Sequence, residues 1–96
     1  METGDIVAVV TMSGEYVGEL VDASNGQVEL KNPRMVLSDG QGKMGFAKGV
    51  CVSGVENPTS QVFNQFIFMA EVNEVIRDGH KQAVSSIEVV KPKIVT

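Results

Sequence analysis

The sequence predicts a mostly β protein: a small, strongly bent, five-stranded antiparallel barrel followed by a C-terminal helix. Three short β-branched runs lie within residues 6–33, and turn residues separate them at Ser13-Gly14 and Asn25-Gly26. Asn-Gly between such runs is the strongest local signal for a tight hairpin, because both central residues of that turn need a positive φ. From Val72 onward the apolar period changes from two residues to three or four, which indicates a helix.

The five expected strands cover residues 6–12, 15–23, 27–37, 44–52 and 62–70. The first strand is apolar on both faces, so we expect it to be buried on both sides. In the third strand, Val28 and Leu30 alternate with the charged Glu29 and Lys31, which predicts one inward and one outward face. Pro33 cannot donate to a ladder, so this strand should break or become an edge there.

A helix is expected over residues 73–85. Its apolar stripe consists of Val72, Val75, Ile76, Gly79, Ala83, Val84 and Ile87. That spacing is typical of an amphipathic helix, although residues 72–77 could instead extend the fifth strand. Residues 88–95 form a short apolar tail with Pro92, which is either an added strand on a neighbouring sheet edge or mobile.

The chain is expected to be a single domain over residues 1–96, with the barrel at 6–70 and the helix and tail at 72–96. A lone cysteine, Cys51, excludes an internal disulfide and suits a reducing compartment, and we expect it to be buried as a small hydrophobe. The N-terminus is polar and acidic, and no apolar run approaches the roughly 18 residues that would cross a membrane. We therefore expect a cytoplasmic protein without membrane contact.

Two patterns carry a family resemblance: Tyr16-x-Gly18-x-Leu20 and, after the hairpin, Val28-x-Leu30-x-Asn32-Pro33. Together they resemble the first motif of the Sm and Sm-like family, and the terminal Asn-Pro is most similar to Sm-like proteins of marine tailed phages. Gly18 inside a strand marks a sharp bend or a close approach of another strand, as a small bent barrel requires. The resemblance implies an SH3/Sm-like barrel that forms a homo-oligomeric ring by edge-strand pairing, the alternative being a monomer whose edge the helix covers.

The same resemblance implies single-stranded RNA as a partner, since Sm-like rings bind uridine-rich RNA at the pore. The family's hairpin aspartate, stacking residue and asparagine fall here on Ser24, Gly26 and Gln27. Only Gln27 keeps comparable hydrogen-bonding capacity, and Gly26 cannot stack on a base. The family's Ile-Arg-Gly signature has a distorted counterpart at residues 76–79, on the predicted helix.

The candidate RNA-binding residues are Ser24, Asn25, Gln27, Lys31, Asn32 and Arg34. Lys31 and Arg34 could form a basic ring at a pore despite the net charge of −4, an acidic balance that argues against strong nonspecific binding of nucleic acid. The alternative is that these charges are scattered on the surface and that Asn32-Pro33 is a turn device.

No catalytic or cofactor site is expected. His80 is the one histidine of the chain, lies far from Cys51 in sequence, and is expected to face solvent. One histidine and one cysteine cannot supply the three or four ligands of a metal site. The glycine-rich run at residues 40–45 lacks the spacing and the hydroxyl of a phosphate-binding loop. The sequence thus predicts an Sm-like ring that binds single-stranded RNA or, alternatively, a structural assembly ring without RNA binding.

Overall fold

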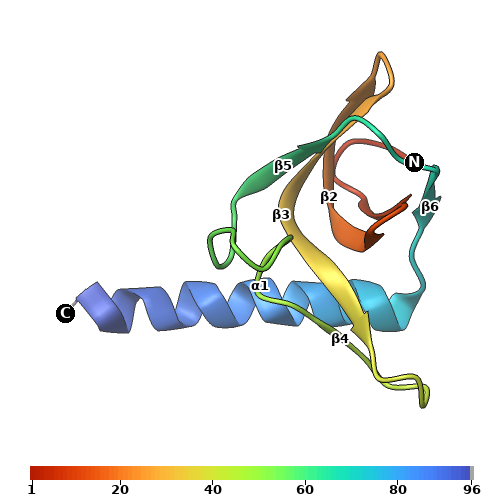
Figure 1. The fold of residues 1–96 in the computed structure, drawn as a ribbon. Helices are drawn as coiled ribbons and strands as arrows, with labels where there is room; N and C mark the ends of the chain where they lie inside the picture. The colour runs from red at the N-terminus through yellow and green to blue at the C-terminus, as the bar shows by residue number, and fades with distance from the viewer. Residues whose placement is uncertain (96) are drawn as a thin grey trace.

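The computed structural model describes residues 1–95, and for residues 86–95 it describes the backbone alone. It confirms the mostly β fold with a C-terminal helix (Figure 1). The elements are β1 (Ile6–Thr11), β2 (Gly14–Ser24), β3 (Gln27–Ser38), β4 (Met44–Phe46), β5 (Ser60–Phe63), β6 (Phe68–Glu71) and α1 (Glu74–Val95). All strand pairs are antiparallel, in the order β4–β3–β2–β1–β6, with β5 also beside β3.

The meander of β1, β2 and β3 confirms the first three predicted strands to within one or two residues at each end. The β2–β3 hairpin turns at Asn25 and Gly26, whose φ values are +54° and +76°. These are the left-handed conformations that the Asn-Gly pair predicts.

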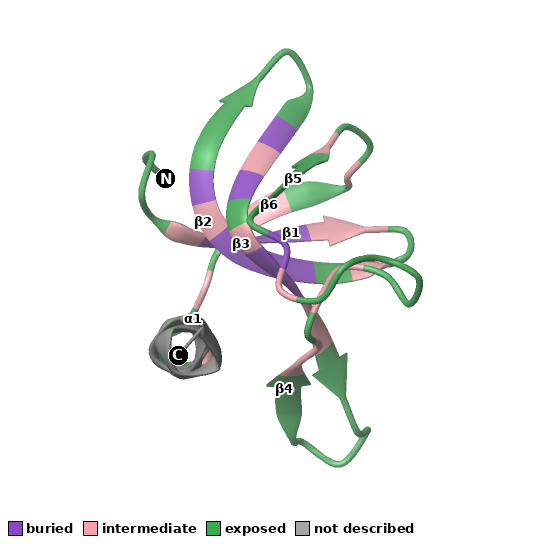
Figure 2. Cartoon of the chain, turned by 90° about the vertical axis from the view of Figure 1, so that its left-hand side faces the viewer, coloured by how far each residue is buried: buried purple, intermediate pink, exposed green. Residues whose placement is uncertain are grey.

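The core lies where β1, β2 and β3 cross (Figure 2). Its central cluster is Val7, Val9, Leu20, Val28 and Leu30, against which Phe63, Phe66 and Met69 pack. Ala8, on the opposite face of β1, is buried as well. Burial of successive β1 residues confirms that this strand is covered on both sides.

Gly18 lies where β2 and β3 approach most closely. A Cβ atom at this position would stand 2.9 Å from the Cβ of Leu30 and 3.1 Å from the carbonyl oxygen of Lys31. The Leu30 Cβ is bonded directly to the backbone and the Lys31 oxygen is part of it. Neither atom can therefore move away unless β3 itself shifts. The close approach that the sequence predicts at Gly18 is therefore confirmed.

The fourth predicted strand, at residues 44–52, is wrong in extent. Only the three residues of β4 pair with β3, and residues 47–59 form a loop that returns along the outer side of β3. The Met35 amide donates to the Gly49 carbonyl (3.0 Å), and the Asn32 amide donates to that of Thr59 (2.9 Å). Cys51 is exposed on this loop, so its predicted burial is also wrong.

The fifth predicted strand, at residues 62–70, is two strands. Its beginning lies in β5 beside β3, and its end lies in β6 beside β1. Since β2 separates β1 from β3 in the sheet, one straight strand cannot pair with both, and residues 64–67 carry the chain across. The sheet consequently has six strands rather than five, and the pairings among the described residues do not close it into a barrel.

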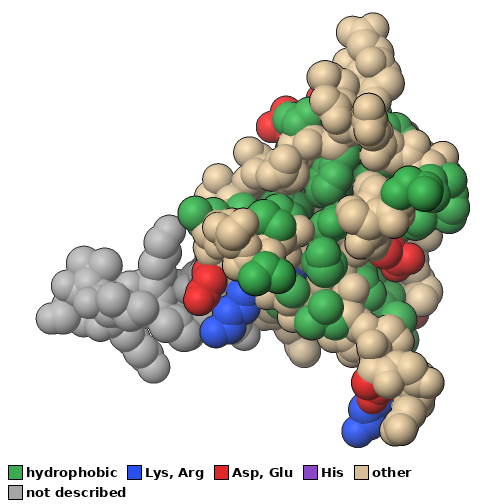
Figure 3. Space-filling view, in the orientation of Figure 1, with side chains coloured by type: hydrophobic (Ala, Val, Ile, Leu, Met, Phe, Trp, Pro, Cys, Tyr) green, Lys and Arg blue, Asp and Glu red, His purple; other side chains and the backbone are tan. Residues whose placement is uncertain are grey.

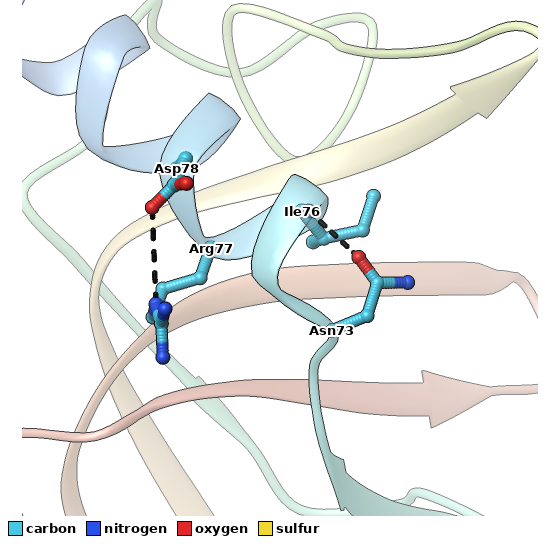
Figure 4. A network of polar contacts seen from close by, with 4 residues as sticks. All are labelled: Asn73, Ile76, Arg77 and Asp78. Atoms are coloured by element: carbon cyan, nitrogen blue, oxygen red, sulfur yellow. Dashed lines mark hydrogen bonds and ion pairs between the residues drawn. The ribbon is translucent and has the colours of Figure 1, made fainter.

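Helix α1 begins where the sequence predicts. The Asn73 side-chain oxygen accepts a hydrogen bond from the Ile76 amide at 2.9 Å (Figure 4), which is a typical N-cap. Residues 74–77 are helical, so the alternative of a longer fifth strand is wrong. The predicted end of the helix at residue 85 is wrong, because the α1 backbone continues to Val95 and includes residues 88–95, for which the sequence predicts an added strand or a mobile tail. The side chains of residues 86–95 lie outside the described part of the chain, as does Thr96.

Candidate functional site

The tip of the β2–β3 hairpin carries three of the six candidate residues. Ser24, Asn25 and Gln27 are all exposed there. The Ser24 hydroxyl donates a hydrogen bond to the Asp22 carboxylate at 2.9 Å. The tip therefore presents amide and hydroxyl groups beside a negative charge, a surface able to exchange hydrogen bonds with a polar ligand and poorly suited to neutralising phosphates.

A bulge in β3 carries the next candidate residues. Val17 pairs with Arg34 and Glu19 pairs with Lys31, so β3 has one more residue than β2 in this interval. Asn32 takes the left-handed conformation with a φ of +52°, which asparagine tolerates better than most residues. The buried Pro33 follows, and its missing N–H costs no ladder bond at a bulge. Pro33 thus bends β3 without ending it.

Arg34 is only 2% exposed. Its guanidinium donates to the carbonyl oxygen of Pro33 at 2.8 Å, and burial lowers its pKa. Lys31 is exposed, whereas Asn32 is half-buried. On the single chain these three residues share the bulge and do not form one accessible basic surface. The structure thus separates the candidate residues into an exposed hairpin tip and a largely internal bulge.

The prediction that His80 faces solvent is wrong, because its side chain is 3% exposed. Its Nε2–H donates to the carbonyl oxygen of Asn32 at 2.7 Å. The Phe46 ring meets the imidazole edge-on, with 6.0 Å between ring centroids. A Cβ at the preceding Gly79 would stand 3.2 Å from the Phe46 ring, so this glycine lets α1 approach β4. These contacts seat the helix on the bulge.

Burial is the largest influence on His80 and lowers the pKa of its imidazole. The positive charge of Arg34 acts in the same direction, whereas the hydrogen bond to Asn32 and the carboxylate of Glu19 raise the pKa. The net effect is a lowered pKa, so the neutral imidazole is favoured where α1 meets the sheet.

A cavity of about 460 Å³ lies between α1 and the bend of β2 and β3. The residues that line it are Ile6, Glu19, Asn32, Arg77, Asp78, His80, Lys81, Val84 and Ser85. The Arg77 Nε atom lies 3.9 Å from the Oδ1 atom of Asp78, so the two side chains form an ion pair (Figure 4). The lining contains two acidic and two basic side chains, Glu19 and Asp78 with Arg77 and Lys81, so it carries no excess of either sign. Sequence reasoning missed this site, since its two walls lie more than 40 residues apart along the chain.

Exposed apolar side chains lie on and next to the edge strands β5 and β6. Val62 on β5 is 47% exposed, Phe68 on β6 is 52% exposed, and Ile67 just before β6 is 59% exposed. Hydrophobic side chains reach the surface over the middle of the face shown in Figure 3 and at its β6 side. A hollow of about 480 Å³ adjoins β6 between the β1–β2 turn and residues 65–67.

Among the described residues, no group of three or more histidine, cysteine or acidic side chains is placed to hold a metal ion. Within the same part of the chain, no helix has both the length and the apolar character needed to span a membrane. No protein-family model matches the chain, and no curated protein matches its sequence.

Proposed function

We propose that this chain is a non-catalytic, Sm-like assembly module whose copies join into a ring by pairing the β5 edge of one copy with the β6 edge of the next. In this proposal the five strands β5–β3–β2–β1–β6 form a strongly bent sheet of SH3/Sm type, and β4 is an extension of it. The observation that carries the proposal is that β5, beside β3, and β6, beside β1, each pair with one strand only among the described residues.

Both edges have the properties that strand pairing requires. β5 and β6 each comprise four residues, and on their outer sides the backbone N–H and C=O groups have no strand partner among the described residues. Such edges are templates for another strand unless charge, proline or a covering element protects them. A pairing between two different edges is head-to-tail, and it closes into a ring when the rotation between copies permits.

The alternative in which the helix covers the β5 or the β6 edge finds little support. The described contacts between α1 and the sheet run to Asn32 on β3 and to Phe46 on β4. Val62 on β5 and Phe68 on β6 both remain half-exposed. The apolar surface at the edges is therefore available to a second copy of the chain.

Placing a lysine on either edge should dissociate the assembly. In Val62→Lys and Phe68→Lys, an ammonium group would be buried between subunits, so we expect the dissociation constant to rise about a hundredfold or more. The measurement is the molar mass by light scattering over a dilution series. Val75→Lys is the matched control, because Val75 is 78% exposed on α1 and belongs to neither edge strand, and this variant should keep the mass of the wild type. A wild type that is monomeric at every concentration would overturn the ring. Edge variants that keep the assembled mass would overturn the β5–β6 interface.

Single-stranded RNA at the hairpin end is a second candidate function, favoured by the exposed amides of Asn25 and Gln27. The buried Arg34 and the acidic balance of the chain predict weak binding with a small salt dependence. We expect Gln27→Ala to weaken binding of labelled oligo-uridine by about fivefold, the size of one lost hydrogen bond, and Lys43→Ala, a change at another exposed position, to leave it unchanged. Oligo-adenine serves as the sequence control. An intact assembly that binds neither oligonucleotide at low salt would contradict RNA binding and leave structural assembly as the only proposed function.

A further inference from the structure

The described part of α1 is held to the sheet by few contacts. Within residues 74–85, His80 is the only fully buried residue. Its bond to Asn32 is the only hydrogen bond between a side chain of these residues and the sheet. Ile76, Gly79, Ala83 and Val84 are half-buried. A segment with as little buried surface as residues 74–85 belongs to the part of a structure that opens first.

The carbonyl oxygen of Asn32 depends on His80 for its hydrogen bond within the protein. A bulge interrupts the ladder, so the backbone groups of the extra residue lose their strand partners. The Asn32 amide finds the Thr59 carbonyl in the returning loop, and its carbonyl oxygen is bonded by His80. If α1 undocked, the Asn32 carbonyl would lose its hydrogen bond to His80, and water would have to replace it. The His80 bond therefore joins the stability of the bulge to the docking of the helix.

We propose that α1 is a strap that docks on the β3 bulge while His80 is neutral and detaches when His80 gains a second proton. A carbonyl oxygen can only accept, so the neutral ring must carry its proton on Nε2. The second proton binds Nδ1 and creates an imidazolium in a buried place. The charged or titratable groups that face His80 or line its cavity are Glu19 from β2, Arg34 from β3, and Arg77, Asp78 and Lys81 from α1. Phe46, from β4, brings no charge.

The direction of the pH effect follows from linkage. The docked state lowers the pKa of His80, so the undocked state binds the proton more tightly. The equilibrium constant for docking has its largest value at pH values above the ordinary histidine pKa of about 6.5. As the pH falls from there toward the lowered pKa of the docked state, the docking constant should fall by up to about tenfold per pH unit. This inference does not depend on ring formation.

Amide hydrogen exchange of the full-length chain tests the strap. From about pH 7.5 to about pH 5, a range spanning the ordinary histidine pKa, peptides covering residues 73–85 should lose protection after correction for intrinsic rates. Peptides from β1–β3 should keep theirs. His80→Gln retains a side-chain N–H donor and cannot titrate, so its helix protection should not change with pH. Wild-type protection that stays constant, or an equal loss in His80→Gln, would overturn the proposal.

A second measurement covers the case in which His80→Gln fails to fold, which fast exchange in its β1–β3 peptides would reveal. His80 is the one histidine of the chain, so its ring proton signals can be assigned without variants. The pH at which these signals titrate should coincide with the loss of helix protection in the wild type. A helix that stays protected after the ring has titrated would also overturn the proposal.

Discussion

Gly18→Ala should destabilise the protein by about 3 kcal/mol, the upper end of the usual cost of overpacking. The added methyl group would meet the Leu30 Cβ at 2.9 Å and the Lys31 carbonyl oxygen at 3.1 Å. Relief requires β2 and β3 to separate, and these strands carry the longest pairing in the sheet. For a small domain this loss is a large fraction of the total free energy of unfolding.

Denaturant unfolding followed by circular dichroism measures this loss, at one protein concentration for all variants because association would add to the apparent stability. The matched control is Gly45→Ala. Gly45 is also a strand glycine, in β4, and no atom lies within 4 Å of the position its Cβ would take. We expect no loss of stability in this control. An unfolding midpoint for Gly18→Ala equal to that of the wild type would show that the two strands are not in close contact.

Leu30→Ala is the second substitution with a large expected effect, about 3–4 kcal/mol. Leu30 is fully buried at the centre of the core cluster and pairs with Leu20 across β2 and β3. Truncation removes apolar contacts and leaves a cavity that the two bent strands cannot easily close. The effect should appear in both the thermal and the denaturant midpoints.

Leu37→Ala is the control for this experiment, because Leu37 lies on the same strand and is 49% exposed. We expect this variant to lose less than about 1 kcal/mol, in keeping with the share of the side chain already in water. Equal losses of stability at Leu30 and Leu37 would mean that another copy of the chain covers Leu37 in the native assembly, since Leu37 is half-exposed in the single chain. A stable Leu30→Ala variant would contradict the position of the core.

The parts of the fold that sequence reasoning located are those set by neighbours in the chain. The Asn25-Gly26 turn, the alternation of Val28 and Leu30, and the capped start of α1 near Asn73 all depend on residues within a few positions of each other. Gly18 is an instructive case, since the missing side chain signalled a close approach without naming the partner. The structure supplies that partner as Leu30.

Sequence reasoning failed where a residue's surroundings come from distant segments. Residues 62–70 are largely apolar, and only the polar pair Asn64-Gln65 interrupts them. Their pairing with two separated strands divides them into β5 and β6 at this point. His80 lies between Ile76 and Val84 on the apolar stripe of its helix, but the group that it contacts there, the Asn32 carbonyl, is 48 residues earlier. Arg34 resembled a surface cation, and the bulge at Asn32 placed it inside.

By itself, the sequence determined the local conformations: the three-stranded meander, its left-handed turn residues and the amphipathic helix. Those features follow from side-chain sterics and from the periods of two and 3.6 residues, which act over a single turn or strand. Only the tertiary structure decided the six-stranded order, the open edges at β5 and β6, and the burial of His80 and Arg34. Each of these depends on which distant backbone segments find hydrogen-bond partners in the folded chain, and no local pattern encodes that choice.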